Sequence, residues 1–446
     1  MAKASAKKKT AKRSPSRTPS TKTGFSFIRE VGGIKEYCLE KNGLRILLAR
    51  DTSVPVVGFM VTYHVGSRNE AIGYTGATHL LEHLMFKASR KYNEASGKDP
   101  KHFLEALGGM MNATTWFDRT NYFEIMPKHL LNEAIEWEAD RMRTALITEK
   151  DRSDEMPIVR NEFERGENLS IEALDKQIWA IAYQAHPYHH STIGWKSDIE
   201  GVSTERLNQF YNDFYWPDNA TVTAVGDFDE GEALTSIAKH FGEHTKKPDG
   251  YPAMYTEEPE QGGERRVTVK RAGTNMIGIA HKIPNAAHAD MPALLVLTTI
   301  LDNGKSSRLY KALVDTAIAT DVNVFCYELR DPGLFITYAS LTPKTPHEKA
   351  EKVIRKVYEE LQIVNIPASE LARAKRLLRT QIAQRRDGPY QLLSLVNESI
   401  ATGEWEYFLK VIEAIPQVTA TDIRRVAKTY LVDDRSTVGQ FVNTAL

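Results

Sequence analysis

Two histidines and a glutamate at short spacing are the residues of this chain best suited to chemistry. They lie in residues 76–86, which read G-A-T-H-L-L-E-H-L-M-F. His79 and His83 are four residues apart, so on a helix they share one face and can direct ring nitrogens at one metal ion. Glu82 lies beside that face, where a carboxylate can accept a proton from an attacking water. The order H-x-x-E-H inverts the H-E-x-x-H zinc-binding motif, but taken alone it fits an amphipathic core helix equally well.

A hydrolytic zinc site needs three protein ligands and one open position. A long helical pattern over residues 151–184 places Glu155 and Glu162 seven residues apart, two turns along one helix face. Glu162 is the leading candidate for the third ligand. Glu155 is suited to hydrogen-bond to a ligand from behind. An exposed helical glutamate is ordinarily a solvated charge, so these assignments depend on the wider pattern.

Composition places the rest of the chain among folded proteins of two domains. The 446 residues are 41% hydrophobic and 26% charged, and no apolar run approaches the roughly 20 residues that span a bilayer. Cys38 and Cys326 lie far apart, which disfavours a disulfide framework or a thiolate metal site. Residues 1–24 hold eight Lys and Arg and no acidic residue, so the remainder carries a net charge of −8. We expect this basic tail to be disordered.

The elements that must position the motif follow a strand-rich pattern after the tail. Strands at 36–39 and 44–49 flank Asn42-Gly43, a hairpin turn signal, and 54–65 predicts a central strand. Further predicted elements of the first half are helices at 98–107, 128–142, 151–184, 204–215 and 230–240 and strands at 110–115, 121–126 and 220–226.

Residues 242–264 are rich in Pro, Gly, Lys and Glu and predict a linker. Beyond them a similar order of strands and helices resumes. Its predicted strands are 266–271, 275–281, 322–327, 333–341 and 436–441, and its helices are 287–301, 306–314, 346–362, 368–383, 390–401 and 420–430. We therefore expect an α+β fold of two duplicated α/β half-units, each a mostly antiparallel sheet with helices packed on one face. The expected divisions are a tail (1–24), an N-terminal zinc-binding catalytic domain (25–241), the linker (242–264) and a homologous domain without a metal site (265–446).

Beyond the motif, ordered matches over nearly the whole chain after the tail resemble the pitrilysin-type H-x-x-E-H zinc peptidases. The resemblance is greatest to the two-domain subunits similar to mitochondrial processing peptidase. The matching segments are 65–70, 79–83, 112–115, 118–122, 155–162, 186–188, 193–194, 215–220, 225–227, 306–309 and 333–335.

The resemblance implies roles for individual residues. It implies His79, His83 and Glu162 as ligands of one Zn²⁺ per chain, Glu82 as general base, and Glu155 as a supporting glutamate. Asn112 and Ala113 match the edge strand on which family members bind an extended peptide. His186, His189 and His190 match a packing segment, so we do not expect a second metal site there.

One departure from the family pattern concerns the second half. Active single-chain members carry there an Arg and a Tyr seven residues apart that contact the substrate, and a gapless alignment from Ser306 places Val314 and Asp321 at these positions. Neither side chain can replace the pair. We therefore expect a homologous partner subunit to supply it in a heterodimer, with a homodimer as the alternative.

The resulting interpretation is a zinc endopeptidase that cuts peptides or unfolded protein segments. A non-catalytic structural or binding subunit of the same fold is the alternative, and intact His79, Glu82, His83 and Glu162 disfavour it. Nucleic-acid binding is suggested by the composition of the tail alone and is not expected, and no membrane association is expected. The expected location is cytoplasmic, with a mitochondrial location as the alternative because the tail resembles a transit peptide in composition.

Overall fold

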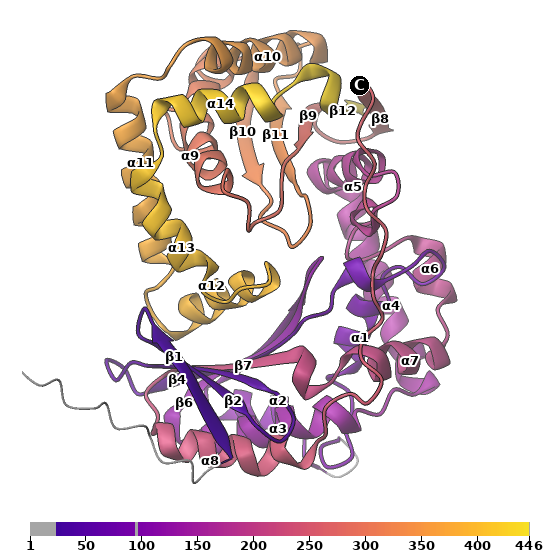
Figure 1. Ribbon diagram of the computed structural model, residues 1–446. Helices are drawn as coiled ribbons and strands as arrows, with labels where there is room; N and C mark the ends of the chain where they lie inside the picture. The colour runs from indigo at the N-terminus through magenta and orange to yellow at the C-terminus, as the bar shows by residue number, and fades with distance from the viewer. Residues whose placement is uncertain (1–23, 94–96, 446) are drawn as a thin grey trace, which may run out of the picture.

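Two β-sheets organise the chain, one in each half (Figure 1). The computed structural model describes residues 24–93 and 97–445. The predicted basic tail, apart from Gly24, therefore lies outside the described residues. In Figure 1 the first half forms the lower part of the molecule and the second half the upper part.

The first sheet has seven strands in the order β1-β2-β3-β7-β4-β6-β5. All neighbours pair antiparallel except β3 and β7. The hairpin at Asn42-Gly43 joins β2 to β3 as predicted, and β4 is central as predicted. The strands are β1 Phe25–Val31, β2 Ile34–Leu39, β3 Arg45–Arg50, β4 Val56–Tyr63, β5 Met110–Thr115, β6 Thr120–Pro127 and β7 Ala220–Gly226.

The second sheet repeats this topology with five strands in the order β10-β11-β9-β12-β8. Its single parallel pair is β12 with β8. Read from the other end, β8-β12-β9-β11-β10 matches β3-β7-β4-β6-β5 in order and in strand direction, so the predicted duplication is confirmed. The strands are β8 Arg265–Arg271, β9 Met276–Lys282, β10 Ala319–Cys326, β11 Leu334–Leu341 and β12 Ser436–Asn443.

Helices of each half cover one face of its own sheet. Helices α3 and α8 lie below the first sheet in Figure 1, and α10 and α14 lie beside the second. The helices are α1 Ala77–Leu84, α2 Pro100–Ala106, α3 Leu131–Thr144, α4 Glu149–Asn168, α5 Ser170–Ala182, α6 Lys196–Gly201, α7 Thr204–Phe214, α8 Glu230–His240, α9 Met291–Leu301, α10 His347–Ile363, α11 Ala368–Gln384, α12 Pro389–Ala401, α13 Tyr407–Ala414 and α14 Ala420–Tyr430.

The two halves also exchange one helix each, which the sequence did not predict. Helix α12 of the second half packs on β4 and β7 of the first sheet, and α5 of the first half packs on β12, β8 and β9 of the second. A glycine in the matching central strand admits each helix. A Cβ at Gly58 in β4 would lie 2.4 Å from Leu393 of α12, and one at Gly278 in β9 would lie 2.5 Å from Ile178 of α5. Each sheet is thus covered on its second face by the opposite half.

The exchange depends on a break in the helical pattern predicted over 151–184. The structure ends α4 at Asn168 and begins α5 at Ser170, with Leu169 between them in extended conformation (φ −91°, ψ 119°). Gly166 weakens the last turn of α4, and asparagine and serine favour helix ends over helix interiors. Strand β1 and helices α6 and α13 were not predicted from the sequence. The short helix predicted over 306–314 contains a π-helical turn at Tyr310–Val314 in the structure.

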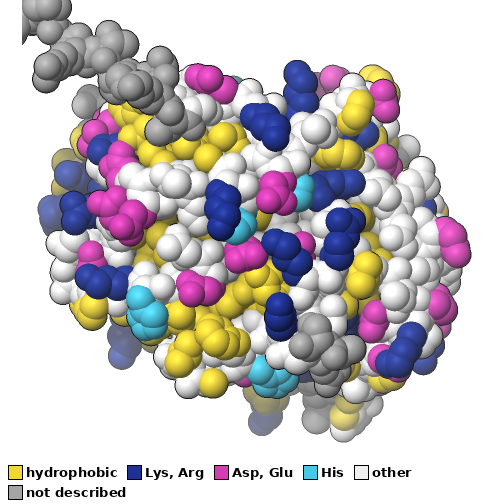
Figure 2. Space-filling view, turned by 90° about the horizontal axis from the view of Figure 1, so that it is seen from below, with side chains coloured by type: hydrophobic (Ala, Val, Ile, Leu, Met, Phe, Trp, Pro, Cys, Tyr) yellow, Lys and Arg dark blue, Asp and Glu magenta, His cyan; other side chains and the backbone are white. Residues whose placement is uncertain are grey.

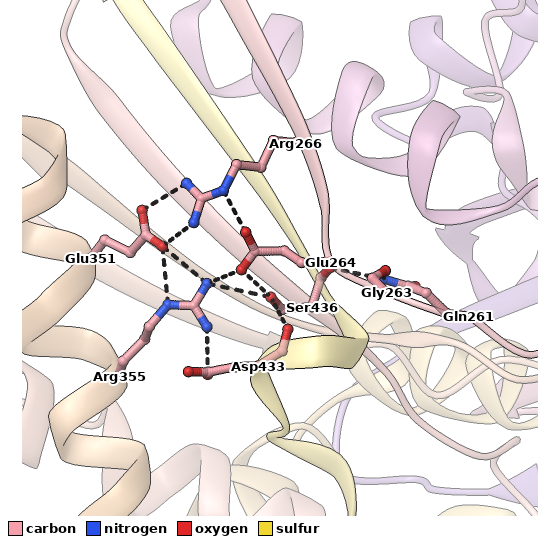
Figure 3. A network of polar contacts seen from close by, with 8 residues as sticks. All are labelled: Gln261, Gly263, Glu264, Arg266, Glu351, Arg355, Asp433 and Ser436. Carbon is pink, nitrogen blue, oxygen red and sulfur yellow. Dashed lines mark hydrogen bonds and ion pairs between the residues drawn. The ribbon is translucent and has the colours of Figure 1, made fainter.

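A charged network fastens the end of the predicted linker to the second sheet (Figure 3). Arg266 on β8 bonds Glu351 of α10 through two nitrogens, at 3.0 and 2.5 Å. Arg355 of α10 bonds the same carboxylate at 3.0 Å and also pairs with Glu264 and Asp433. Helix α10 therefore holds the start of β8 in place, in addition to the backbone pairing of β8 with β12.

The lower face of the molecule carries basic and acidic side chains interspersed with small apolar areas (Figure 2). Among residues 24–93 and 97–445, no helix is both long enough and apolar enough to cross a bilayer.

Candidate metal and peptide site

Helix α1 carries the H-x-x-E-H motif, and its entry is fixed by close backbone contacts. Gly76 precedes the helix with φ of 85°, a left-handed conformation that L side chains rarely adopt. A Cβ at Gly76 would lie 2.4 Å from the carbonyl oxygen of Ile193, and one at Gly194 would lie 2.4 Å from Thr75. Glycine is required on both sides of this approach, so α1 begins at one defined place.

Buried Glu70 caps the first turn of α1 in place of an N-cap side chain. Its carboxylate accepts hydrogen bonds from the backbone N–H groups of Gly76 at 2.8 Å and Thr78 at 2.7 Å. Burial raises the pKa of Glu70 to about 8, against the lowering effect of these hydrogen bonds. The bonds satisfy N–H groups that have no partner within the helix. Leu80, Leu81 and Leu84 are fully buried, and the two histidines face the opposite way. The helix is therefore anchored at its end and along its apolar face.

The structure brings His79, His83 and Glu162 together. The Nε2 atoms of His79 and His83 lie 3.6 and 3.4 Å from Oε2 of Glu162 on α4. The three potential ligand atoms lie within 4.8 Å of one another, and they form the only such group of three His, Cys, Asp or Glu side chains found among the described residues. A tetrahedral zinc with ligand distances of about 2.0–2.1 Å has ligand–ligand separations of about 3.3–3.4 Å. The donor set and its spacing therefore fit zinc.

Glu155 fixes the orientation of His83. Its Oε1 lies 2.9 Å from Nδ1 of His83, and its Oε2 lies 2.5 Å from Nζ of Lys87. Burial opposes ionisation of Glu155, but hydrogen bonds from Lys87 and His83 outweigh it and hold the pKa below its usual value. A carboxylate accepting from Nδ1–H places the lone pair of His83 on Nε2, the atom that faces Glu162.

Burial keeps His79 neutral. Desolvation, with a smaller contribution from His83, lowers the pKa of His79 to about 3. Neutral imidazole is the form that binds a metal. Nδ1 of His79 is buried without a hydrogen-bond partner among the described residues.

Glu82 lies beside the ligand group and is 8% exposed. Its Oε2 accepts a short hydrogen bond from the hydroxyl of Thr115 at the end of β5. Burial raises the pKa of Glu82, against the lowering effect of this hydrogen bond. A carboxylate with a raised pKa is better able to hold a proton between two steps of a reaction at neutral pH.

Strand β5 lies at the open edge of the first sheet, because it pairs with β6 only. It also contacts α1. The N–H of Ala113 donates to the side chain of its neighbour Asn112 at 2.9 Å rather than to another strand. An added strand at this edge would accept from the N–H of Ala113 in place of the Asn112 side chain. The predicted substrate residues and the predicted metal ligands lie on adjacent elements.

The remaining predicted positions have other surroundings. Val314 ends the π-helical turn, and Asp321 lies exposed on β10, where its carboxylate accepts from Asn323. His186 accepts from the N–H of Tyr188 at 3.2 Å and lies 3.1 Å from Asp331 of the second half. Its ring joins a contact between the two halves.

The sequence analysis missed three residues that shape the site: Thr115, Lys87 and Glu70. Lys87 follows His83 by four residues, and Thr115 follows Ala113 by two. Helix and strand periodicity therefore contained the signal for both. The capping role of Glu70 depends on a loop that periodicity does not describe.

The chain is similar to known peptidases over most of its length. Residues 45–196 match the insulinase family, peptidase family M16, and residues 201–378 match the M16 inactive domain. The zinc protease PqqE of Helicobacter pylori is 30% identical, over 89% of this chain and 90% of its own. The bovine mitochondrial-processing peptidase subunit beta is 25% identical, over 94% and 86%. The crystal structure of a protease from Helicobacter pylori superposes with a TM-score of 0.87 at 28% identity, over 92% of this chain and 99% of that one.

Proposed function

The chain belongs to the M16 family of peptidases, and we propose that it is a zinc-dependent endopeptidase acting on peptides or unfolded protein segments. The observation that carries the proposal is the convergence of His79, His83 and Glu162 beside the buried carboxylate of Glu82. In this proposal the three residues hold one zinc per chain. Zinc, when bound, lowers the pKa of a water and polarises the carbonyl of the scissile bond.

The chain's own residues supply proton transfer and orientation. Glu82 accepts the proton of the attacking water on its carboxylate and passes it to the leaving amine. Thr115 holds that carboxylate by its short hydrogen bond. Glu155 keeps the ring of His83 in place. Asn112 and Ala113 on the edge of β5 bind the extended peptide by strand addition, once the amide of Asn112 releases the N–H of Ala113.

The same proposal assigns the domains. The catalytic domain is 25–241, the linker is 242–264, and 265–446 is the homologous domain that lacks the metal site. The proposed compartment is the cytoplasm, with the mitochondrion as the alternative, and cell fractionation with an antibody to the chain distinguishes them.

We further propose a homologous partner subunit that supplies the Arg–Tyr pair. Val314 and Asp321 offer no donor to an oxyanion. Arg119 lies near Glu82, but its guanidinium bonds Thr114, Asn121 and Glu398. Loss of donors aimed at the oxyanion costs about 10²–10³-fold in rate. The purified chain alone should therefore turn over slowly, and the partner should restore the rate without changing zinc content. Fast cleavage by a strictly homo-oligomeric preparation would contradict a heterodimer.

A non-catalytic subunit of the same fold is the competing function, and one experiment separates the two. Zinc content and cleavage of a quenched peptide are measured for the wild type, with its partner where one is needed, and for Glu82→Gln. We expect about one zinc per chain in both proteins and chelator-sensitive cleavage in the wild type alone. Glu105→Gln, an exposed glutamate on α2, is the matched control. Full activity of Glu82→Gln, or loss of its zinc, would refute the roles assigned here.

A further inference from the structure

Arg119 directly precedes β6 and ties the end of β5 to the start of β6. The residue is 8% exposed. Its Nη1 donates hydrogen bonds to the hydroxyl of Thr114 on β5 at 2.6 Å and to the side-chain oxygen of Asn121 on β6 at 2.8 Å. The hydroxyl of Thr114 donates in turn to the same oxygen of Asn121 at 2.6 Å. The guanidinium therefore closes a ring of hydrogen bonds at one end of the edge strand.

Helix α12 of the second half, which lies above the first sheet in Figure 1, supplies the other contacts of this group. Nη2 of Arg119 donates to Oε1 of Glu398 on α12 at 2.6 Å. The neighbouring Asn397 donates to the side-chain oxygen of Asn121 at 3.1 Å, and its own oxygen accepts from the hydroxyl of Thr62 on β4 at 2.8 Å. Two adjacent residues of α12 therefore bond to β4, to β6 and to the turn that joins β5 to β6.

The next residue of β5 connects this group to the candidate site. Thr115 follows Thr114, and its hydroxyl donates to the proposed general base, Glu82. Successive side chains of a strand point to opposite faces of the sheet. Thr114 accordingly bonds to Arg119 on the face that carries α12, whereas Thr115 bonds to Glu82 of α1 on the other face. A shift at the end of β5 would therefore move the hydroxyl that holds Glu82.

We propose that Glu398 of α12 is a positioning residue for Glu82, acting through Arg119 on the end of β5. The inference rests on the proposed peptidase function. The side chain of Glu398 is 40% exposed, so the ion pair alone contributes little to stability. Arg119 is buried, and loss of its partner would make the guanidinium shift or leave its donors unpaired. Glu398 thus limits where the guanidinium lies, and the guanidinium limits where Thr114 and Thr115 lie.

A second ion pair between the halves separates this effect from general packing. Glu406, which directly precedes α13, lies 3.0 Å from Arg29 of β1, and β1 is at the opposite edge of the first sheet from β5. This pair joins the same two halves as Arg119 and Glu398 do. If Glu398 served only to hold the halves together, replacing Glu406 would have the same consequences as replacing Glu398.

The test compares Glu398→Ala and Glu398→Gln with the control Glu406→Ala, in a preparation whose wild type cleaves a quenched peptide. Glu398→Ala should lower kcat by about 10–100-fold with a smaller change in KM and unchanged zinc content, because a small misplacement near the reacting atoms costs up to about 100-fold. Glu398→Gln keeps an acceptor for Arg119 and should restore the rate to within a few-fold of the wild type. Glu406→Ala should cleave as the wild type does.

A double-variant cycle tests whether the effect passes through Arg119. Arg119→Ala should lower kcat at least as much as Glu398→Ala does. The protein with both substitutions should cleave no more slowly than Arg119→Ala alone, because Glu398 then has no group through which to act. Losses that multiply as independent effects would overturn the proposed route.

Amide hydrogen exchange of residues 108–122 gives a readout that does not depend on activity. Exchange should be faster in Glu398→Ala than in the wild type or in Glu406→Ala. Unchanged kcat in Glu398→Ala, or an equal loss in Glu406→Ala, would overturn the positioning role. If no wild-type preparation cleaves a peptide, the peptidase function is refuted, and the exchange data alone then decide whether Glu398 positions β5: faster exchange in Glu398→Ala alone supports it, and equal exchange in all three proteins overturns it.

Discussion

Replacing Glu155 by Gln should weaken zinc binding about 10–100-fold while leaving the three proposed ligands in place. The carboxylate accepts from Nδ1 of His83 at 2.9 Å and is 5% exposed. A hydrogen bond to a charged, buried acceptor contributes about 1.5–3 kcal/mol, which corresponds to about 10–100-fold in a binding constant. Replacing a residue that hydrogen-bonds to a metal-binding histidine generally weakens metal affinity by this factor.

The fold should tolerate this substitution because Gln keeps the volume and one acceptor oxygen. Lys87 loses its ion partner, but it is 35% exposed and water can solvate its ammonium. The melting temperature of the zinc-free protein should therefore change little. A loss of zinc affinity will then reflect a changed interaction at His83 and not unfolding of the protein.

The assay is a competition titration against a chelator of known affinity, for wild type, Glu155→Gln and Glu164→Gln. Glu164 lies on the same helix and is exposed, and its only ion pair within the described part of the chain is with Lys196 at 3.8 Å, so its variant should bind zinc as the wild type does. Because Gln can still accept from Nδ1 of His83, equal zinc affinity in Glu155→Gln and the wild type would refute a contribution of the Glu155 charge to zinc binding. Equal loss in both variants would show a general charge effect.

Three further predictions concern stability and pH. Glu70→Ala removes two buried hydrogen bonds to the start of α1 and should lower the free energy of unfolding by about 2–4 kcal/mol in urea titration, whereas exposed Glu257→Ala should not. Gly76→Ala should destabilise more than Gly73→Ala, because both glycines have positive φ but only Gly76 has backbone atoms where a Cβ would lie; equal melting temperatures would contradict the close approach. Burial opposes ionisation of Asp331, but hydrogen bonds from His186 and Arg68 outweigh this effect and lower the pKa of Asp331 to about 2. The ionised carboxylate therefore stabilises the fold fully above the unfolded-state pKa of about 4, and this stabilisation is lost as the pH falls towards 2. Asp331→Asn should cost about 1–2 kcal/mol near neutral pH, with the difference from wild type shrinking between pH 4 and pH 2, and a pH-independent difference would show that its charge is not involved.

Much of the fold was predictable because the governing signals are local. The hairpin at Asn42-Gly43, the central strand β4 and the duplicated order of strands all follow from turn residues and periodicity. The group of His79, His83 and Glu162 could also be predicted, since the two histidines share a helical face and Glu162 lies on a long helical pattern. The exchange of α5 and α12 between the halves could not be predicted, because the sequence does not show which sheet a helix packs against. Gly58 and Gly278 mark the contact points, but a glycine in a strand indicates close approach without identifying the approaching partner.

The second half, which carries no counterpart of this group among its described residues, is nonetheless part of the site. Helix α5 continues from α4, the helix that holds Glu162, across the single extended residue Leu169. Helix α5 packs on β12, β8 and β9. The second sheet therefore fixes the direction in which the chain continues after α4, the helix that carries Glu162. Tyr327, in the segment that follows β10, lines a cavity beside His79 and Glu162. A change in how the halves pack would therefore alter both the position of Glu162 and the shape of this cavity. The second half therefore has a structural role at the candidate site: its sheet directs the helix that follows the proposed ligand Glu162.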